Sequence, residues 1–413
     1  MIRTFGNNLL VFIKKWIRKI DWRCVAAVLI AFGVTRLMVL VITYFSMAQL
    51  SVPSAEKFWR YNPRNLIADG LLRWDTGWYL GIARFGYDLK STAFFPLYPL
   101  LIRLASLVTG NIWTSGLWIS NGAFLIALFY FYALARQEFD SETAGRAVFY
   151  LAAAPAAFFF STVYSESIFV LFVVACFYYA RNGKWIPAAL AGALASATRL
   201  PGILVTVFIF FEALWQQDIR FIPKPWRLRA QAALLLMDLK QLPKARKGIL
   251  ACLFSTSGLI AYMVFLYQKF GTPFAFLHAE TDWNRKINLD WFIQLVQNII
   301  AMHKPSGNIL SGQVGSIYYL MDTFALVILI PLVVIVFLKF RPSFGWYTFL
   351  ALLMPLVSSN PVSMRRFALG LIPCTLLLAV WGKRPWVDRL ILGISLPLQA
   401  YLLVLFSHWL FAG

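Results

Sequence analysis

Eleven apolar segments make up about half of this chain, and polar or basic stretches separate them. Backbone polar groups inside a bilayer must bond to one another, so a continuous apolar segment satisfies them only as a helix. With 60% hydrophobic and 13% charged residues, a soluble protein of 413 residues could not bury this apolar surface. The segments cover about 24–47, 113–135, 147–163, 166–180, 186–198, 201–215, 249–269, 318–338, 345–357, 367–382 and 390–412. We predict an all-α polytopic membrane protein, built as one integral membrane domain over residues 1–413.

The distribution of lysine and arginine predicts which loops face the cytoplasm, because cytoplasmic loops are enriched in both. A cytoplasmic N-terminus places 23 of the 38 basic residues inside, mainly in the arm 1–23 and the loop 216–248. Loops 48–112 and 270–317 then lie outside. Segment 94–108 carries two prolines and an arginine, so we expect it to lie along or re-enter the outer interface. The prediction is about eleven transmembrane helices and an external C-terminus.

Several function classes can be set aside from the sequence. The net charge of +21 follows mostly from this topology, so it does not indicate nucleic-acid binding. No Walker A loop, no GxGxxG motif and no DxD motif occurs, which argues against a nucleotide-fuelled pump or a nucleotide-sugar donor. The four cysteines show no CxxC pattern and the three histidines are scattered, so neither a metal site nor a cofactor is expected. No cleavable signal peptide is evident.

The segment WDTGWYLGIARFGYDLKSTAFFPLYP at 74–99 combines acids with many aromatic side chains. Aromatic faces and hydroxyls suit sugars and lipids, and a carboxylate beside them can take a proton from a hydroxyl. We predict Asp75 as the catalytic acid/base, and also as the residue before a helix that Gly86 ends. The neighbouring candidates for substrate binding are Trp74, Trp78, Tyr79, Tyr87 and Asp88; Asp88 is equally well interpreted as a solvated turn residue.

Other unusual polar residues fall in loops predicted on the same outer face. Glu166 and Tyr164 in VYSES are candidates for substrate contact, with an acid at a helix N-terminus as the alternative for Glu166. Arg199 is interpreted either as a phosphate ligand or as a buried partner of Glu166. Arg365 and Arg366 in NPVSMRRF suit a phosphate, because guanidinium groups bind its oxygens in pairs; anchoring to lipid headgroups is the alternative.

Loop 270–317 begins GTPFAFLHAETDWNRK and could cover the site as a lid. His278 is its candidate for substrate binding, and nothing in the sequence favours it over Glu280. The alternative is a solvated connector with an interfacial aromatic anchor.

The motif WDTGWYLGIARFGYD followed by AFFPLYPLLIR resembles the signature of PIG-V-type mannosyltransferases, the second GPI mannosyltransferase and its prokaryotic relatives. The later stretches VYSES, ATRLPG, FGTPFAF and SMRRF fit the family in the same order. The resemblance implies the GT-C fold of membrane glycosyltransferases and a polyprenyl-phosphate sugar donor such as dolichyl-phosphate mannose. It also implies that the family's first-loop aspartate corresponds to Asp75. The basic loop 216–248 has no match in the family pattern.

Together these features predict a membrane glycosyltransferase that moves a sugar, mannose by resemblance, from a polyprenyl-phosphate donor in the bilayer to a glycolipid or glycan acceptor. The predicted site faces outward, to the periplasm, the cell exterior or the ER lumen, and one displacement inverts the anomeric carbon. The alternatives are a GT-C transferase of another sugar, and a lipid-linked sugar flippase. Transporters place polar groups at mid-membrane and often show paired halves, and neither pattern is evident here.

Overall fold

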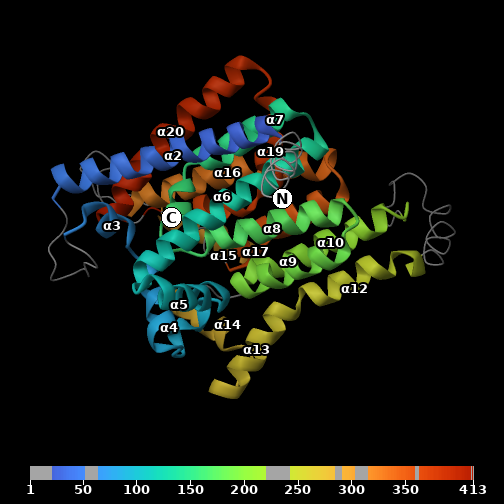
Figure 1. Cartoon of the computed structure of the whole chain (residues 1–413), viewed down its shortest axis with the longest axis horizontal. Helices are drawn as coiled ribbons and strands as arrows, with labels where there is room; N and C mark the ends of the chain where they lie inside the picture. The colour runs from blue at the N-terminus through green and yellow to red at the C-terminus, as the bar shows by residue number, and fades with distance from the viewer. Residues whose placement is uncertain are drawn as a thin grey trace, which may run out of the picture.

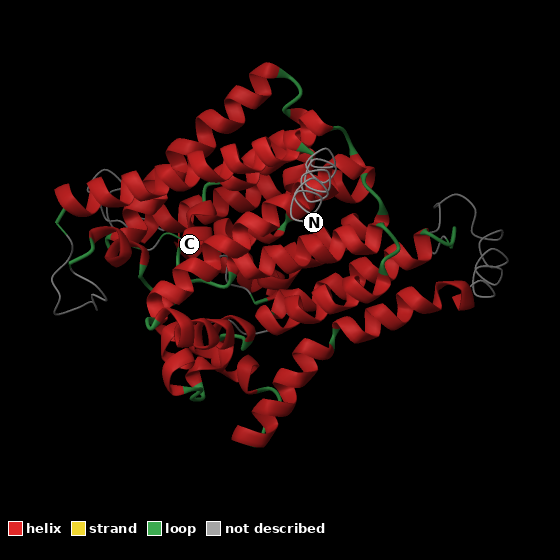
Figure 2. Cartoon of the chain, viewed as in Figure 1, coloured by secondary structure: helices red, strands yellow, loops and turns green. Residues whose placement is uncertain are grey.

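The computed structural model describes residues 21–51, 64–219, 242–283, 291–302, 315–358, 362–410 and 412. Within these residues the chain is all-helical and contains no strand (Figure 2). Most of the predicted basic arm and most of the loop 216–248 lie outside the described residues, as do parts of the loops 48–112 and 270–317. The all-α prediction is confirmed for the part that is described.

The helices follow the predicted apolar segments closely. They are α2 (Trp22–Gln49), α3 (Leu66–Leu71), α4 (Thr76–Phe85), α5 (Leu97–Thr109), α6 (Ile112–Glu138), α7 (Ser141–Ala153), α8 (Glu166–Arg181), α9 (Trp185–Thr198), α10 (Val205–Trp215), α12 (Arg246–Ser255), α13 (Ser257–Phe270), α14 (Ala275–Glu280), α15 (Trp291–Met302), α16 (Gly315–Lys339), α17 (Pro342–Val357), α18 (Met364–Phe367), α19 (Ile372–Trp381) and α20 (Pro385–Ser407). Short 3₁₀ turns include η1 (Lys90–Ala93), η2 (Ala157–Ser161) and η3 (Leu200–Leu204).

Five helical stretches in the described part are long and apolar enough to cross a membrane, or six if one bent pair counts as a span. They are Trp22–Gln49, Ile112–Glu138, Leu242–Phe270, Leu320–Lys339 and Pro385–Ser407, and the bent pair joins Met364–Gly370 to Ile372–Trp381 at 83°. Large apolar side chains stay exposed along α2, α13 and α16, as expected of surfaces in contact with lipid. The chain is therefore an integral membrane protein, while the count of eleven spans and the cytoplasmic N-terminus remain predictions.

The predicted span 147–163 is not one helix. α7 ends at Ala153, two residues before Pro155, and the chain continues through η2. A proline disfavours the helical conformation of the residue before it, and the break leaves backbone carbonyls without helical partners. Arg36 of α2 donates to the carbonyl oxygens of Ala152 and Ala157 at 3.2 and 3.0 Å, and Gln399 of α20 donates to Ala152 at 3.2 Å. These two buried side chains stabilise the break.

α6 and α8 form the centre of the bundle and pack against each other (Figure 1). α2 and α20 lie along one side of this pair, and α9, α12 and α13 lie along the other (Figure 1). α4 and α5 pack together beside one end of α6. The helix α5 matches the segment 94–108, which we expected at the outer interface. The first helix of the aromatic-rich segment 74–99 therefore rests against α6.

Candidate active site

Asp75 lies at a sharp turn between α3 and α4. Trp74 has a φ of 54°, a conformation rarely adopted by a residue with a side chain, and α4 begins at Thr76. The helix ends before Gly86, whose φ of 86° is accessible to glycine, so the predicted helix is confirmed. Asp75 precedes α4 as predicted, yet its side chain makes no capping bond. The carboxylate is turned toward another part of the chain.

The partner of Asp75 is Arg366, on the short helix α18. Nη1 of Arg366 lies 2.7 Å from Oδ2 of Asp75. The two side chains are 11% and 22% exposed, so water screens their attraction less than at an open surface. The guanidinium also packs near the rings of Phe159 and Tyr164, each 5.7 Å from its central carbon. A predicted base and a predicted phosphate ligand, 291 residues apart, are thus in direct contact.

Glu166 extends this pair into a chain of four alternating charges. It begins α8, and its Oε1 atom lies 3.5 Å from Nε of Arg366. The same oxygen accepts a hydrogen bond from Arg199, which lies between α9 and η3 and also donates to Ser165 at 3.3 Å. Glu166 is nearly fully buried, and its second oxygen, Oε2, has no hydrogen-bond partner among the described residues. A buried carboxylate oxygen without a donor is costly, and a substrate hydroxyl would satisfy it.

Two buried tyrosines fix the backbone of the site. The hydroxyl of Tyr164 accepts a hydrogen bond from the backbone N–H of Asp75 at 3.0 Å and donates to the carbonyl oxygen of Arg73 at 3.4 Å. The hydroxyl of Tyr79 lies 2.8 Å from Oγ of Ser165. Burial raises the pKa of Tyr79 well above its ordinary value, so this hydroxyl stays neutral. Both tyrosines join the turn at Asp75 to the start of α8.

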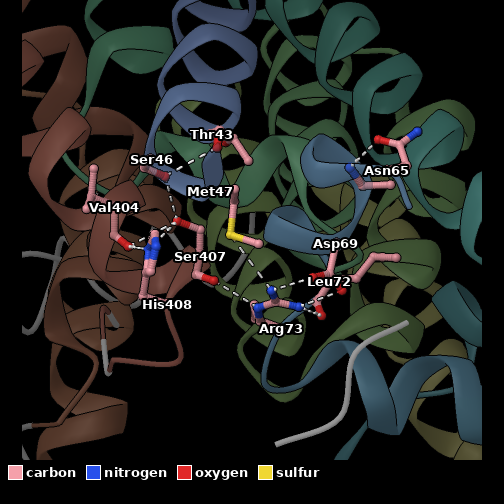
Figure 3. Close-up of polar contacts among 11 residues, drawn as sticks. Thr43, Ser46, Met47, Asn65, Asp69, Leu72, Arg73, Val404, Ser407 and His408 are labelled. Carbon is pink, nitrogen blue, oxygen red and sulfur yellow. Dashed lines mark hydrogen bonds and ion pairs between the residues drawn. The ribbon is translucent and has the colours of Figure 1, made fainter. Parts of the chain in front are cut away.

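Arg73, which we did not predict from the sequence, stabilises the turn that leads to Asp75 (Figure 3). Its fully buried guanidinium forms an ion pair with Asp69 at 3.0 Å and donates through Nε to the carbonyl oxygen of Ser407 at 2.9 Å. The ring of Trp409 lies 5.2 Å from the guanidinium carbon. The i,i+4 spacing of Asp69 and Arg73 could have predicted their ion pair. No feature of the sequence predicts the contact of Arg73 with α20.

Arg365 faces away from Asp75 and is held by Asp322 of α16. Its Nε lies 2.8 Å from Oδ1 of Asp322, and its Nη2 lies 3.3 Å from Oδ2. The backbone N–H groups of Ser363 and Arg365 also donate to this carboxylate, at 3.1 and 3.2 Å. The buried pair fixes α18 against α16, so the structure separates the two adjacent arginines into different roles.

The remaining candidates lie along the first outer loop and α14. Asp88 is exposed and accepts from the backbone N–H of Ser91 at 2.8 Å, which fits its turn interpretation. Tyr87 donates to the carbonyl oxygen of Phe94 at 2.7 Å, and Trp78 stacks on the Phe94 ring with centroids 5.6 Å apart. Trp74 lies near the ring of Trp409, at 5.7 Å. His278 is exposed on α14. None of these contacts joins the four-charge chain directly.

In the described part of the chain, no three His, Cys, Asp or Glu side chains gather closely enough to hold a metal ion. The candidate site combines arginines, carboxylates and hydroxyls. Two guanidinium groups can receive a phosphate, and two carboxylates can accept protons or hydrogen bonds from hydroxyls.

The family model described as Mannosyltransferase (PIG-V) matches residues 25–304, and the chain belongs to this family. No curated protein matches the chain. Its apolar spans are those of a membrane protein.

Solved structures show a distant similarity over almost the whole chain. The oligosaccharyltransferase AglB of Archaeoglobus fulgidus, in complex with an inhibitory peptide and a dolichol-phosphate, is 14% identical with a TM-score of 0.45, over 96% of this chain and 57% of that one. ArnT of Cupriavidus metallidurans in the apo state is 14% identical with a TM-score of 0.42, over 91% and 75%. The chain thus spans little more than half the length of the oligosaccharyltransferase. At these TM-scores the GT-C topology stays a prediction.

Proposed function

We propose that this protein is a membrane glycosyltransferase that moves mannose from a polyprenyl-phosphate donor to an acceptor hydroxyl on the non-cytoplasmic face, with inversion at the anomeric carbon. The observation that carries the proposal is the 2.7 Å contact between Asp75 and Arg366. A general base and a cation for the leaving phosphate must lie within one sugar's width of each other. The sequence motifs suggested these two roles separately, and the fold brings the two side chains together.

Asp75 is the general base of the proposed reaction. A carboxylate can take the acceptor hydroxyl's proton as that oxygen attacks the anomeric carbon. Its backbone is fixed by Tyr164, and its side chain makes no capping bond to α4, so the helix does not occupy its oxygens. One displacement needs no covalent carboxylate intermediate, so a single base suffices and the anomeric carbon inverts.

Arg366 and Arg199 are the groups that bind the donor phosphate. As the bond between the anomeric carbon and the phosphate oxygen breaks, negative charge grows on the leaving polyprenyl phosphate, and fixed guanidinium groups offset it. Arg365, which is bound to Asp322, holds α18 in place for Arg366. The donor's apolar tail would remain in the bilayer while its head enters this outer end of the bundle.

Glu166 and the aromatic side chains are the proposed sugar contacts. Oε2 of Glu166, which has no partner in the described part of the chain, would accept a hydrogen bond from a sugar hydroxyl. Trp74, Trp78, Tyr79, Tyr87, Asp88 and His278 remain proposals for substrate contact. The acceptor, a glycolipid or glycan hydroxyl, would approach from the aqueous side.

The test is a transfer assay with purified protein, polyprenyl-phosphate mannose and membrane glycolipids as acceptors. We expect product with the wild type, a loss of at least about a thousandfold with Asp75→Asn, and weakened donor use with Arg366→Ala. Polyprenyl-phosphate glucose and arabinose serve as competing donors. Transfer from one of these in place of mannose would refute the sugar assignment, and full activity of Asp75→Asn would refute the base.

A further inference from the structure

Arg366 lies between two carboxylates that are held very differently. Glu166 is buried and is bound by both Arg199 and Arg366, so moving it would leave two cations without their shared partner. Asp75 is more exposed, at 22% of its side chain, and precedes α4 without capping it. Within the described residues, the carboxylate of Asp75 contacts Arg366 alone. Glu166 is the fixed partner of Arg366, and Asp75 is the partner that can leave.

The contact with Asp75 uses the same kind of acceptor that a phosphate offers. Carboxylate and phosphate oxygens both form short charge-assisted hydrogen bonds to guanidinium groups. An acid already paired with Arg366 therefore competes with an incoming phosphate for the same N–H group. A base that stays paired with an arginine is also poorly placed to take a proton from a hydroxyl.

Resting on the proposed function, we propose that Asp75 occupies the place of the donor phosphate on Arg366 before a donor binds, and that donor binding displaces it. The phosphate takes over the Nη1 donor, and the freed carboxylate turns to the acceptor hydroxyl. Glu166 acts as a positioning residue that holds Arg366 during the exchange. The base thus becomes available only when a donor is bound.

The exchange balances in atoms and charge. The acceptor's O–H proton passes to Asp75 while its oxygen bonds to the anomeric carbon. The bond from that carbon to the phosphate oxygen breaks, and the electron pair leaves with the polyprenyl phosphate. Arg366, released from Asp75, then faces the extra negative charge on the phosphate.

The proposal predicts that a variant without activity binds the lipid phosphate more tightly. Asp75→Asn removes the competing charge, so a polyprenyl monophosphate in detergent micelles should bind about tenfold more tightly, equivalent to about 1.4 kcal/mol. Isothermal titration measures the affinity. Asp75→Ser should also raise the affinity for the polyprenyl monophosphate. A thermal unfolding scan checks that each variant is folded. Glu142→Gln, an equal charge change on an exposed side chain of α7, should leave the affinity unchanged.

A double-mutant cycle separates exchange from simple repulsion between Asp75 and the phosphate. Arg366→Gln alone should weaken binding. On this background Asp75→Asn should give no further gain, because no contact remains for Asp75 to occupy. An equal gain on both backgrounds would show repulsion and overturn the exchange. If Asp75→Asn and Asp75→Ser bind the polyprenyl monophosphate with unchanged affinity, the exchange is also overturned. Loss of mannose transfer in these variants would still support the proposed function.

Discussion

Tyr164 shows how one hydroxyl can determine the position of the proposed base. Its oxygen accepts from the backbone N–H of Asp75 and donates to the carbonyl of Arg73. Its ring packs against the guanidinium of Arg366. Tyr164→Phe keeps the ring and leaves the N–H of Asp75 without this acceptor. We expect kcat to fall roughly tenfold or more, because small displacements of a catalytic group are costly, with donor binding nearly unchanged.

Steady-state transfer kinetics at varied donor concentration measure this split. Tyr150→Phe is the matched control, since it removes a hydroxyl that donates to Asp388 at 2.5 Å, away from the four-charge chain. An effect of Tyr164→Phe on KM alone would contradict a role in positioning Asp75.

The adjacent arginines show what the sequence could and could not specify at this scale. Both were predicted for phosphate binding, from their type and their position in a short outer loop. Successive helical residues point about 100° apart, and which one faces the site depends on the neighbouring helices. Asp322, within the apolar helix α16, forms an ion pair with Arg365. Arg366 forms its ion pair with Asp75. No local pattern connects position 322 with 365 or 75 with 366.

At the level of elements, Arg73 connects α3 to α20 next to the turn at Asp75 (Figure 3). It forms an ion pair with Asp69 of α3 and donates a hydrogen bond to the carbonyl oxygen of Ser407 in α20. Both side chains are fully buried, so removing one leaves a buried charge with too few partners. We expect Arg73→Met to destabilise the protein by about 3–5 kcal/mol. The double variant Asp69→Asn with Arg73→Met should recover part of this loss. Thermal unfolding of the single and double variants measures the coupling, and additive effects would contradict a specific pair.

Helix boundaries could be predicted where a local signal sets them. Gly86 ends α4 because its φ of 86° suits a residue without a side chain, and the sequence showed it. The break between α7 and η2 also has a local cause, Pro155. We predicted one continuous span over 147–163 because the residues on both sides of this proline are apolar. Its stabilisation by Arg36 and Gln399 depends on helices far away in the chain. An arginine inside the first span therefore has a partner that the sequence could not name.

Across the whole molecule, the ion pairs between described residues form two groups. Every ion pair between two described residues joins positions predicted on, or next to, the same side. One group links Arg136 to Asp21, Arg146 to Glu142, Arg181 to Glu138 and Glu212, Arg341 to Glu212 and Lys383 to Asp140. The other contains Arg73, Arg199, Arg365 and Arg366 with their carboxylates. The grouping keeps the two predicted faces apart, while the orientation from the positive-inside rule remains a prediction.

This arrangement predicts that Asp88 and Glu142 lie on opposite sides of the membrane. Both side chains are exposed, so a cysteine at either position can be reached by a reagent. In a variant whose four native cysteines are replaced, Asp88→Cys should react with a membrane-impermeant maleimide in intact cells. Glu142→Cys should react only after the membrane is opened, because the positive-inside rule predicts that the loop 136–146, with Arg136 and Arg146, faces the cytoplasm. Labelling of Glu142→Cys in intact cells would reverse the orientation and move the proposed site to the cytoplasmic face.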